Sequence, residues 1–176
     1  GIFENIHIEP APHDAGCSLG SALLVKHQVL NINERDNNLT PYLGVGFSND
    51  QIKIVLDKSN IKYEYHEDIT TITAKLLANG KLVAWFQGRD EWGPRALGSR
   101  SILADPTIKD MKNIINNKIK NREEFRPFAP AVIEEQAKNY FDLSVSSPFM
   151  LYVVPVREEA KQKIPAVVHV DGTARP

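Results

Sequence analysis

From Thr40 onward, short runs rich in β-branched residues alternate with stretches in which apolar residues recur at helical spacing. This alternation is typical of α/β folds, in which helices pack against a sheet around one core. We therefore expect a mixed, twisted sheet flanked by helices. The expected strands are 61–65, 81–86, 128–133, 149–156 and 166–170. Three expected helices begin after Ser48, Asp68 and Asp105, and a fourth covers 134–141.

Short-range signals mark the ends of these helices. Ser48 and Gln51 have the spacing of a capping box, which satisfies free amides at a helix start. Asp68 is placed to cap the second helix, and Asn79-Gly80 offers the left-handed residue that ends it. Asp105-Pro106 has the pattern of a third helix start, because proline needs no amide donor in the first turn.

The first 38 residues have a different pattern. A strand, a turn and one helix cannot bury an apolar face by themselves, so we interpret residues 1–38 as the end of a preceding domain with its linker. Residues 39–176 are then a second domain, whose last residues have the composition of a loop that stops in mid-course. The expected elements of the first segment are a strand at 3–8, a turn at 10–16, a helix at 17–25 and a polar linker at 31–38.

Charge and composition exclude several classes of protein. Among the 176 residues, 21 basic side chains nearly balance 22 acidic ones, which argues against a protein that coats nucleic acid or a polybasic membrane protein. The single cysteine, Cys17, excludes an internal disulfide. Since the sequence has neither a signal-like start nor an apolar run of about 18 residues, we expect no membrane span and, by default, a cytoplasmic location.

Positive charge is concentrated between residues 87 and 126, where nine basic residues meet six acidic ones. Arg89, Arg95 and Arg100 lie in or beside a glycine-containing loop that follows a hydrophobic strand. Glycines let backbone amides approach a phosphate, and an arginine fork donates two charge-assisted hydrogen bonds to its oxygens. This pattern favours a site for a polyanion, although neither a Walker sequence nor G-x-G-x-x-G is present.

Other interpretations of the basic residues stay open. The loop could be a surface turn whose arginines pair with Asp90 and Glu91. A second group of basic residues, which includes Lys120 and Arg126, lies at the end of the expected helix after Asp105. These cations could stabilise the negative end of that helix's dipole. Arg126 lies in the apolar stretch Glu-Phe-Arg-Pro-Phe-Ala-Pro, so we expect a buried anion or a fixed carboxylate beside it.

Weaker signals come from two pairs of titratable residues. His13 and Asp14 precede a small-residue helix, and both side-chain types bind divalent metals, but a helix cap by Asp14 is the more frequent explanation. His169 and Asp171 follow each other closely at the end of an expected strand, where they suit either acid–base chemistry or a turn.

Four motifs then stand in one order along the chain. They are Gln-Gly-Arg through Arg-Ala-Leu-Gly-Ser-Arg-Ser-Ile-Leu-Ala-Asp-Pro at 87–106, Arg-Glu-Glu-Phe-Arg-Pro-Phe-Ala-Pro at 122–130, Ser-Pro-Phe-Met at 147–150 and the stretch 169–176. Together they resemble the O-carbamoyltransferases of the nodulation, cephalosporin and tobramycin type. The resemblance implies that 39–176 is a YrdC-like domain and that 1–38 ends a metal-binding domain with the actin and sugar-kinase fold.

The resemblance also implies an activity. In this family the YrdC-like half joins carbamoyl phosphate to ATP and forms carbamoyl adenylate and pyrophosphate, with loss of the phosphate of carbamoyl phosphate. The other half passes the carbamoyl group to a hydroxyl of an acceptor, which would bind mainly to an N-terminal domain outside this sequence. The competing interpretation is a non-catalytic YrdC-like module that binds anions or RNA, and RNA binding would show a steep salt dependence.

The resemblance carries roles over to individual positions. The cations that would grip the phosphates of carbamoyl phosphate and ATP are Arg95, Lys120, Arg126 and Arg175. The second-ranked nucleotide-binding residues are Arg89, Arg100, Ser101 and Thr173. Asp14 would supply one ligand of a divalent or iron-type metal, whose histidine ligands lie outside this sequence. Arginine and lysine clamps of this kind stabilise charge that shifts during phosphoryl chemistry.

Overall fold

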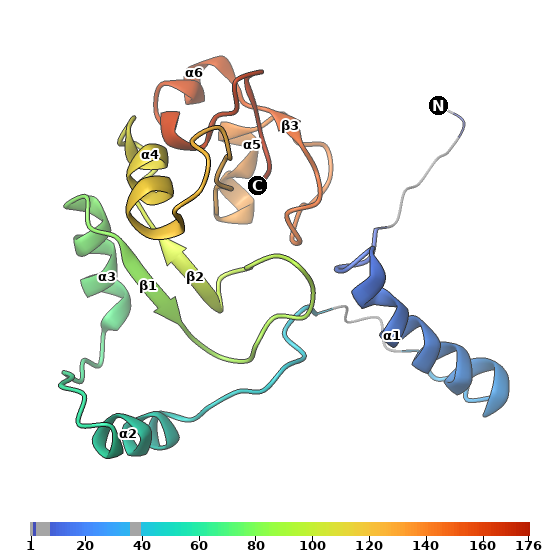
Figure 1. Cartoon of the computed structure of the whole chain (residues 1–176). Helices are drawn as coiled ribbons and strands as arrows, with labels where there is room; N and C mark the ends of the chain where they lie inside the picture. The colour runs from blue at the N-terminus through green and yellow to red at the C-terminus, as the bar shows by residue number, and fades with distance from the viewer. Residues whose placement is uncertain (1, 3–7, 36–39) are drawn as a thin grey trace. The chain divides into compact units, whose positions relative to one another are not determined.

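The computed structural model describes residues 2, 8–35 and 40–176 (Figure 1). The chain divides into two compact units, one from Gly1–Tyr65 with Trp85–Ser101 and the other from His66–Ala84 with Ile102–Pro176. Helices and two small two-stranded sheets occur in the described part of the chain, which confirms the α/β mixture. None of the helices found there has the length and apolar character that crossing a bilayer requires.

Helix α1, Asp14–Leu24, begins three residues earlier than expected and continues as a π-helical turn, Val25–Val29. His13 caps this helix, because its Nδ1 accepts a hydrogen bond from the amide of Ala15 at 3.2 Å. The assignment of the cap to Asp14 is therefore wrong, and Asp14 lies exposed in the first turn.

The helix starts predicted from Ser48 and Asp68 are confirmed. α2, Asn49–Lys58, begins with the expected capping box, in which Ser48 and Gln51 exchange hydrogen bonds between side chain and backbone. α3, Ile69–Ala78, begins after Asp68, whose carboxylate accepts a hydrogen bond from an amide of the first turn. Both signals act over three residues, so they need no support from distant parts of the chain.

After the left-handed Gly80, which follows α3 as expected, the chain forms β1, Val83–Phe86. β1 pairs with β2, Arg100–Leu103, and Figure 1 shows the two arrows running in opposite directions. Alternate residues of β1 are exposed, so this strand is half-buried, and it is two residues shorter than the strand expected at 81–86. Residues 87–99 connect the two strands and are called the glycine loop.

The core of the second unit surrounds its C-terminal strands. β3, Val154–Pro155, and β4, Thr173–Ala174, pair in antiparallel register, and α5, Ala137–Tyr140, lies close to α6, Glu158–Lys161. A second apolar cluster lies around α4, Met111–Ile115. The buried residues of the first cluster are Phe141, Val156, Ala160, Ile164, Val167 and Ala174.

Several predicted strands are wrong. Residues 61–65 and 128–133 form no strand, and 166–170 begins inside a 3-10 helix, Pro165–Val167. A strand needs a partner for its amides and carbonyls, and these segments pair with no other described segment. The strand predicted at 149–156 shortens to β3, and the one at 3–8 falls almost entirely outside the described residues, as does the last part of the linker at 31–38.

Two predicted helices are shorter than expected. α4 begins at Met111 instead of directly after Asp105, because the Asp105 carboxylate accepts the amide of Thr107 and closes a turn there. α4 then continues as a π-helical turn, Asn116–Lys120. The helix predicted at 134–141 is a 3-10 turn followed by α5, so its position is confirmed but not its regularity.

Candidate functional site

The carboxylate of Glu91 holds the glycine loop by hydrogen bonds to its backbone. Glu91 Oε1 accepts hydrogen bonds from three backbone amides, those of Leu97, Ser99 and Arg100, at 2.9, 2.7 and 3.3 Å. The amide between them, that of Gly98, donates to Ser101 Oγ at 3.1 Å. Burial raises the pKa of Glu91, but the amide hydrogen bonds outweigh that effect and leave the pKa below its usual value. Glu91 is therefore ionised at neutral pH.

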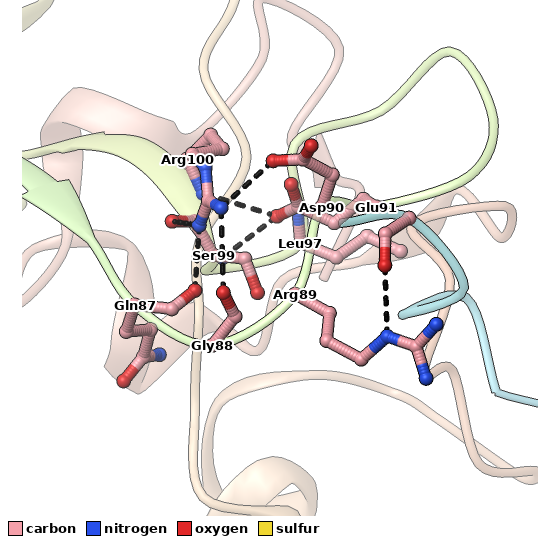
Figure 2. A network of polar contacts seen from close by, with 9 residues as sticks. Gln87, Gly88, Arg89, Asp90, Glu91, Leu97, Ser99 and Arg100 are labelled. Atoms are coloured by element: carbon pink, nitrogen blue, oxygen red, sulfur yellow. Dashed lines mark hydrogen bonds and ion pairs between the residues drawn. The ribbon is translucent and has the colours of Figure 1, made fainter. Parts of the chain in front are cut away.

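Arg100 is fastened to the same loop (Figure 2). Its guanidinium forms an ion pair of 2.7 Å with Asp90 and lies over the ring of Phe86, 3.5 Å from the ring centre. The pairing of an arginine with Asp90, which the surface-turn interpretation predicts, is thus confirmed, whereas Glu91 binds amides instead. Arg100 also donates to three carbonyl oxygens, those of Gln87, Gly88 and Ser99.

Arg89 ties the glycine loop to the chain segment 41–46. Its Nε donates to the carbonyl oxygen of Gly44 at 2.8 Å, and its NH2 group donates to that of Leu43 at 2.9 Å. Backbone hydrogen bonds join the same two segments, including one of 2.6 Å from the amide of Trp92 to Pro41. The guanidinium of Arg89 is therefore engaged in holding the loop.

Arg95 differs from the other two arginines. It lies between Glu91 and Leu97, the two ends that the carboxylate fastens together, and its side chain is exposed. Within residues 2, 8–35 and 40–176 it makes no hydrogen bond or ion pair. Its positive charge is consequently accessible to a ligand.

The second group of predicted cations lies on residues 116–126, called the basic loop. Asn116, 0% exposed, joins the two sides of this loop: its Nδ2 donates to the carbonyl of Arg126 at 3.2 Å, and its Oδ1 accepts from Nε of Arg122 at 2.8 Å. The guanidinium of Arg122 also lies over the ring of Phe128, 4.6 Å from its centre. The π-helical turn ends at Asn121 with a φ of 45°.

The basic loop places Lys120 and Arg126 in solvent. Lys120 is exposed and has no ion pair or hydrogen-bond partner in the part of the chain that the structure describes. Arg126 has the carboxylate neighbour that the sequence predicts, Glu123 at 2.8 Å, but both side chains are about half exposed. Of the two alternatives expected beside Arg126, the neighbouring carboxylate is therefore confirmed, although the pair is exposed; Arg122 is the half-buried arginine of this loop.

Residues 169–175, called the C-terminal turn, contain the last predicted site residues. The Thr173 hydroxyl donates to Asp171 Oδ1 at 2.7 Å, so its oxygen must accept the proton of His169 Nδ1 at 3.1 Å. Burial lowers the pKa of His169, and the positive charge of Arg175 lowers it further, against the opposing charge of Asp171. His169 is thus neutral at neutral pH, with Nε2 as an acceptor.

The C-terminal turn also determines where Arg175 lies. β4 ends at Ala174, which is fully buried, and Arg175 follows it directly with a half-buried side chain. The hydroxyl of Thr173, predicted to contact a nucleotide, is engaged with Asp171 and His169.

The predicted metal ligand Asp14 does not form a metal site with other described residues. No group of three or more histidine, cysteine, aspartate or glutamate side chains in this part of the chain is arranged to hold a metal ion. The neighbouring His13 uses Nδ1 for the α1 cap. The donors among the described residues by themselves therefore do not fit a complete metal site.

The structure distributes the predicted residues over separate loops. Arg89, Arg95, Arg100 and Ser101 belong to the glycine loop and the start of β2, Lys120 and Arg126 to the basic loop, and Thr173 and Arg175 to the C-terminal turn. Sequence reasoning missed Asn116 and the amide-binding role of Glu91. The only sequence signal for Asn116 is its place directly after the apolar face of α4, and Glu91 has none, because its partners are six to nine residues away.

A family model described as the carbamoyltransferase C-terminus matches residues 74–176. The chain is also 44% identical to nodulation protein NolNO of Sinorhizobium fredii and 42% identical to nodulation protein NolO of Bradyrhizobium diazoefficiens. Nodulation protein U of Azorhizobium caulinodans is 36% identical. Each alignment covers 99% of this chain but only 27%, 33% and 30% of the respective relative, so the chain spans about a third of their length or less.

Proposed function

The chain belongs to the family of the carbamoyltransferase C-terminus, and on this premise we propose that it forms the carbamoyl-activating part of an ATP-dependent O-carbamoyltransferase. The reaction consumes carbamoyl phosphate, ATP and water and yields carbamoyl adenylate, pyrophosphate and phosphate. The adenylate then passes its carbamoyl group to a hydroxyl of the acceptor. Residues 39–176 would adopt the YrdC-like fold, and 1–38 would end the domain that binds the acceptor.

The accessible cations of the glycine and basic loops are the observation that carries this proposal. Arg95 and Lys120 are exposed and have no internal partner in the described residues, while the loops that carry them are held by internal hydrogen bonds. Such groups can meet the phosphates of carbamoyl phosphate and ATP without first breaking an ion pair. Positive charge fixed on an ordered backbone is what phosphoryl and nucleotidyl transfer require.

The other proposed residues divide by their contacts. Arg126 and Arg175 would add charge at the phosphates, Arg126 after exchange of its exposed pair with Glu123 for a phosphate. For the second-ranked residues, the observed contacts favour a role in holding the loops, and these residues are Arg89, Arg100, Ser101 and Thr173.

Asp14 is proposed to be one ligand of a divalent or iron-type metal. The described residues do not complete such a site, and by the resemblance its histidine ligands would lie outside this sequence.

The proposal is tested by exchange of labelled pyrophosphate into ATP in the full-length protein, with and without carbamoyl phosphate. We expect exchange that depends on carbamoyl phosphate and falls by a factor of about 100 or more in Arg95→Ala and in Lys120→Ala. Arg35→Ala and Lys58→Ala remove exposed cations elsewhere and should leave exchange unchanged. Absence of exchange in the wild type would overturn the proposed reaction, and near-normal exchange in both loop variants would overturn the assigned roles.

A further inference from the structure

The glycine loop is closed by side chains instead of by a regular strand ladder. Glu91 binds the amides of residues 97, 99 and 100, and Ser101 binds the amide of residue 98. Four successive amides are thus satisfied by two side chains, and Figure 2 labels Glu91 together with Leu97, Ser99 and Arg100, whose amides it binds. The returning side of the loop is fixed to its outgoing side at one carboxylate oxygen, Oε1 of Glu91.

This closure bears directly on Arg95. Arg95 lies within the five residues between Glu91 and Leu97, so the hydrogen bond of 2.9 Å from the Leu97 amide closes a short ring around it. A short closed ring has far fewer conformations than an open loop of the same length. The backbone of Arg95 is therefore ordered before any ligand arrives, while its side chain stays exposed.

The contacts of Glu91 distinguish this role from an ordinary surface ion pair. The neighbouring acid, Asp90, takes the ion pair with Arg100 at 2.7 Å. Oε1 of Glu91 instead accepts hydrogen bonds from part-buried backbone amides. An amide binds an ionised carboxylate more strongly than it binds a neutral acceptor. An ionised Glu91 is thus the internal anion of a loop whose cation, Arg95, is exposed.

We propose that Glu91 is a positioning residue for phosphate binding, because its carboxylate holds the glycine loop in the conformation that presents Arg95 to a phosphate group of the substrate. This inference rests on the proposed function. The gain is preorganisation: a ligand that meets an ordered Arg95 does not bear the entropy cost of ordering the loop.

The test is a double-mutant cycle on the affinity for carbamoyl phosphate, measured by calorimetry in the full-length protein. Glu91→Gln keeps the size of the side chain but removes its charge, and we expect the Kd to rise about tenfold. In the Arg95→Ala background the same change should alter the Kd by less than about twofold, because residues that act through one another are not additive. Glu34→Gln, the same change at an exposed glutamate of the same unit, should leave the Kd unchanged.

Different results overturn different statements. A wild-type Kd in Glu91→Gln, or an equal effect of Glu91→Gln with and without Arg95, would overturn the positioning role while the exchange reaction still supports the proposed function. A wild type that neither binds carbamoyl phosphate nor supports exchange would overturn the proposed function and, with it, this role of Glu91. A general loss of folding would not imitate the expected result, because it would lower affinity in both backgrounds.

A second variant covers the case in which Glu91→Gln does not fold. Glu91→Asp keeps the charge but withdraws the carboxylate by one methylene group, so we expect faster hydrogen exchange at the amides of Leu97 and Ser99 together with weaker binding. Faster exchange with unchanged binding would overturn the proposal, because the order of the loop would then be irrelevant to phosphate affinity.

Discussion

In the glycine loop a carboxylate holds the backbone, whereas in the basic loop a neutral amide does so. Glu91 is half-buried and satisfies three amides with one charged oxygen. Asn116 is 0% exposed and satisfies one acceptor and one donor with the two ends of its amide. Both loops carry exposed cations on a backbone that is held in place, but the side chain that holds the backbone is charged in one loop and neutral in the other.

The degree of burial explains this difference. A half-buried carboxylate keeps part of its hydration, and hydrogen bonds from the amides replace the water contacts that it loses. At a fully buried position the same charge would be costly, whereas an amide with both ends paired is not. The comparison teaches that the charge of a loop-holding side chain follows its exposure, and that of these two side chains only Glu91 can lose a charge when the pH falls.

Removal of the buried amide should produce the largest effect on stability. Asn116→Ala leaves the carbonyl of Arg126 and Nε of Arg122 without their present partner, and we expect the free energy of unfolding to fall by about 1–3 kcal/mol. Asn117→Ala is the matched control, because Asn117 is exposed and makes one long contact of 3.4 Å to Glu124. Equal losses in urea denaturation of both variants would remove the distinction between a buried and an exposed amide.

Acidification should separate the two loops next. The pKa of folded Glu91 is below its ordinary value of 4.5, so its contribution to stability is present above that value and is lost as the pH falls through it and then through the lower folded pKa. Protection factors of the Leu97 and Ser99 amides should drop as the pH falls below about 4.5, while that of the Arg122 amide, which donates to the backbone carbonyl of Asn116, stays constant. Parallel loss in both loops, measured by hydrogen exchange, would contradict the comparison.

The smallest effect should come from the acid next to Glu91. Asp90→Asn removes the ion pair with Arg100, but Asp90 is about half exposed and three carbonyls still hold the guanidinium. We expect a loss of at most about 1 kcal/mol in the free energy of unfolding, reduced further by added salt. A larger loss than that of Asn116→Ala would show that the glycine loop is held mainly by Asp90 and not by Glu91.

The sequence predicted the features that act over short distances. The capping box of Ser48 and Gln51 and the cap by Asp68 involve partners three residues apart, and both are confirmed. The strands predicted at 61–65 and 128–133 are wrong because a β-branched run becomes a strand only where another segment pairs with it, and no local pattern encodes that partner.

The same limit applies to the candidate site. The sequence singled out the arginine-rich loop, and Arg95 is accessible in it, but it gave no means to separate Arg95 from Arg89 and Arg100, whose guanidinium groups hold backbone carbonyls. In the sequence, Asn116 is a polar residue like its neighbours near the end of an expected helix. Only the packing of the folded chain shows that it is buried. Which cations serve the fold and which serve a ligand is decided by contacts between distant residues.

The attachment of the glycine loop to segment 41–46 has a consequence for rates of motion. Arg89, the Trp92 amide and the hydroxyl of Tyr42, which donates to the carbonyl of Leu97, all join the two segments by hydrogen bonds. For the loop to swing away these bonds must break together, so we expect its opening to be a rare, cooperative event on the timescale of local unfolding instead of the nanosecond fluctuation usual for a surface loop.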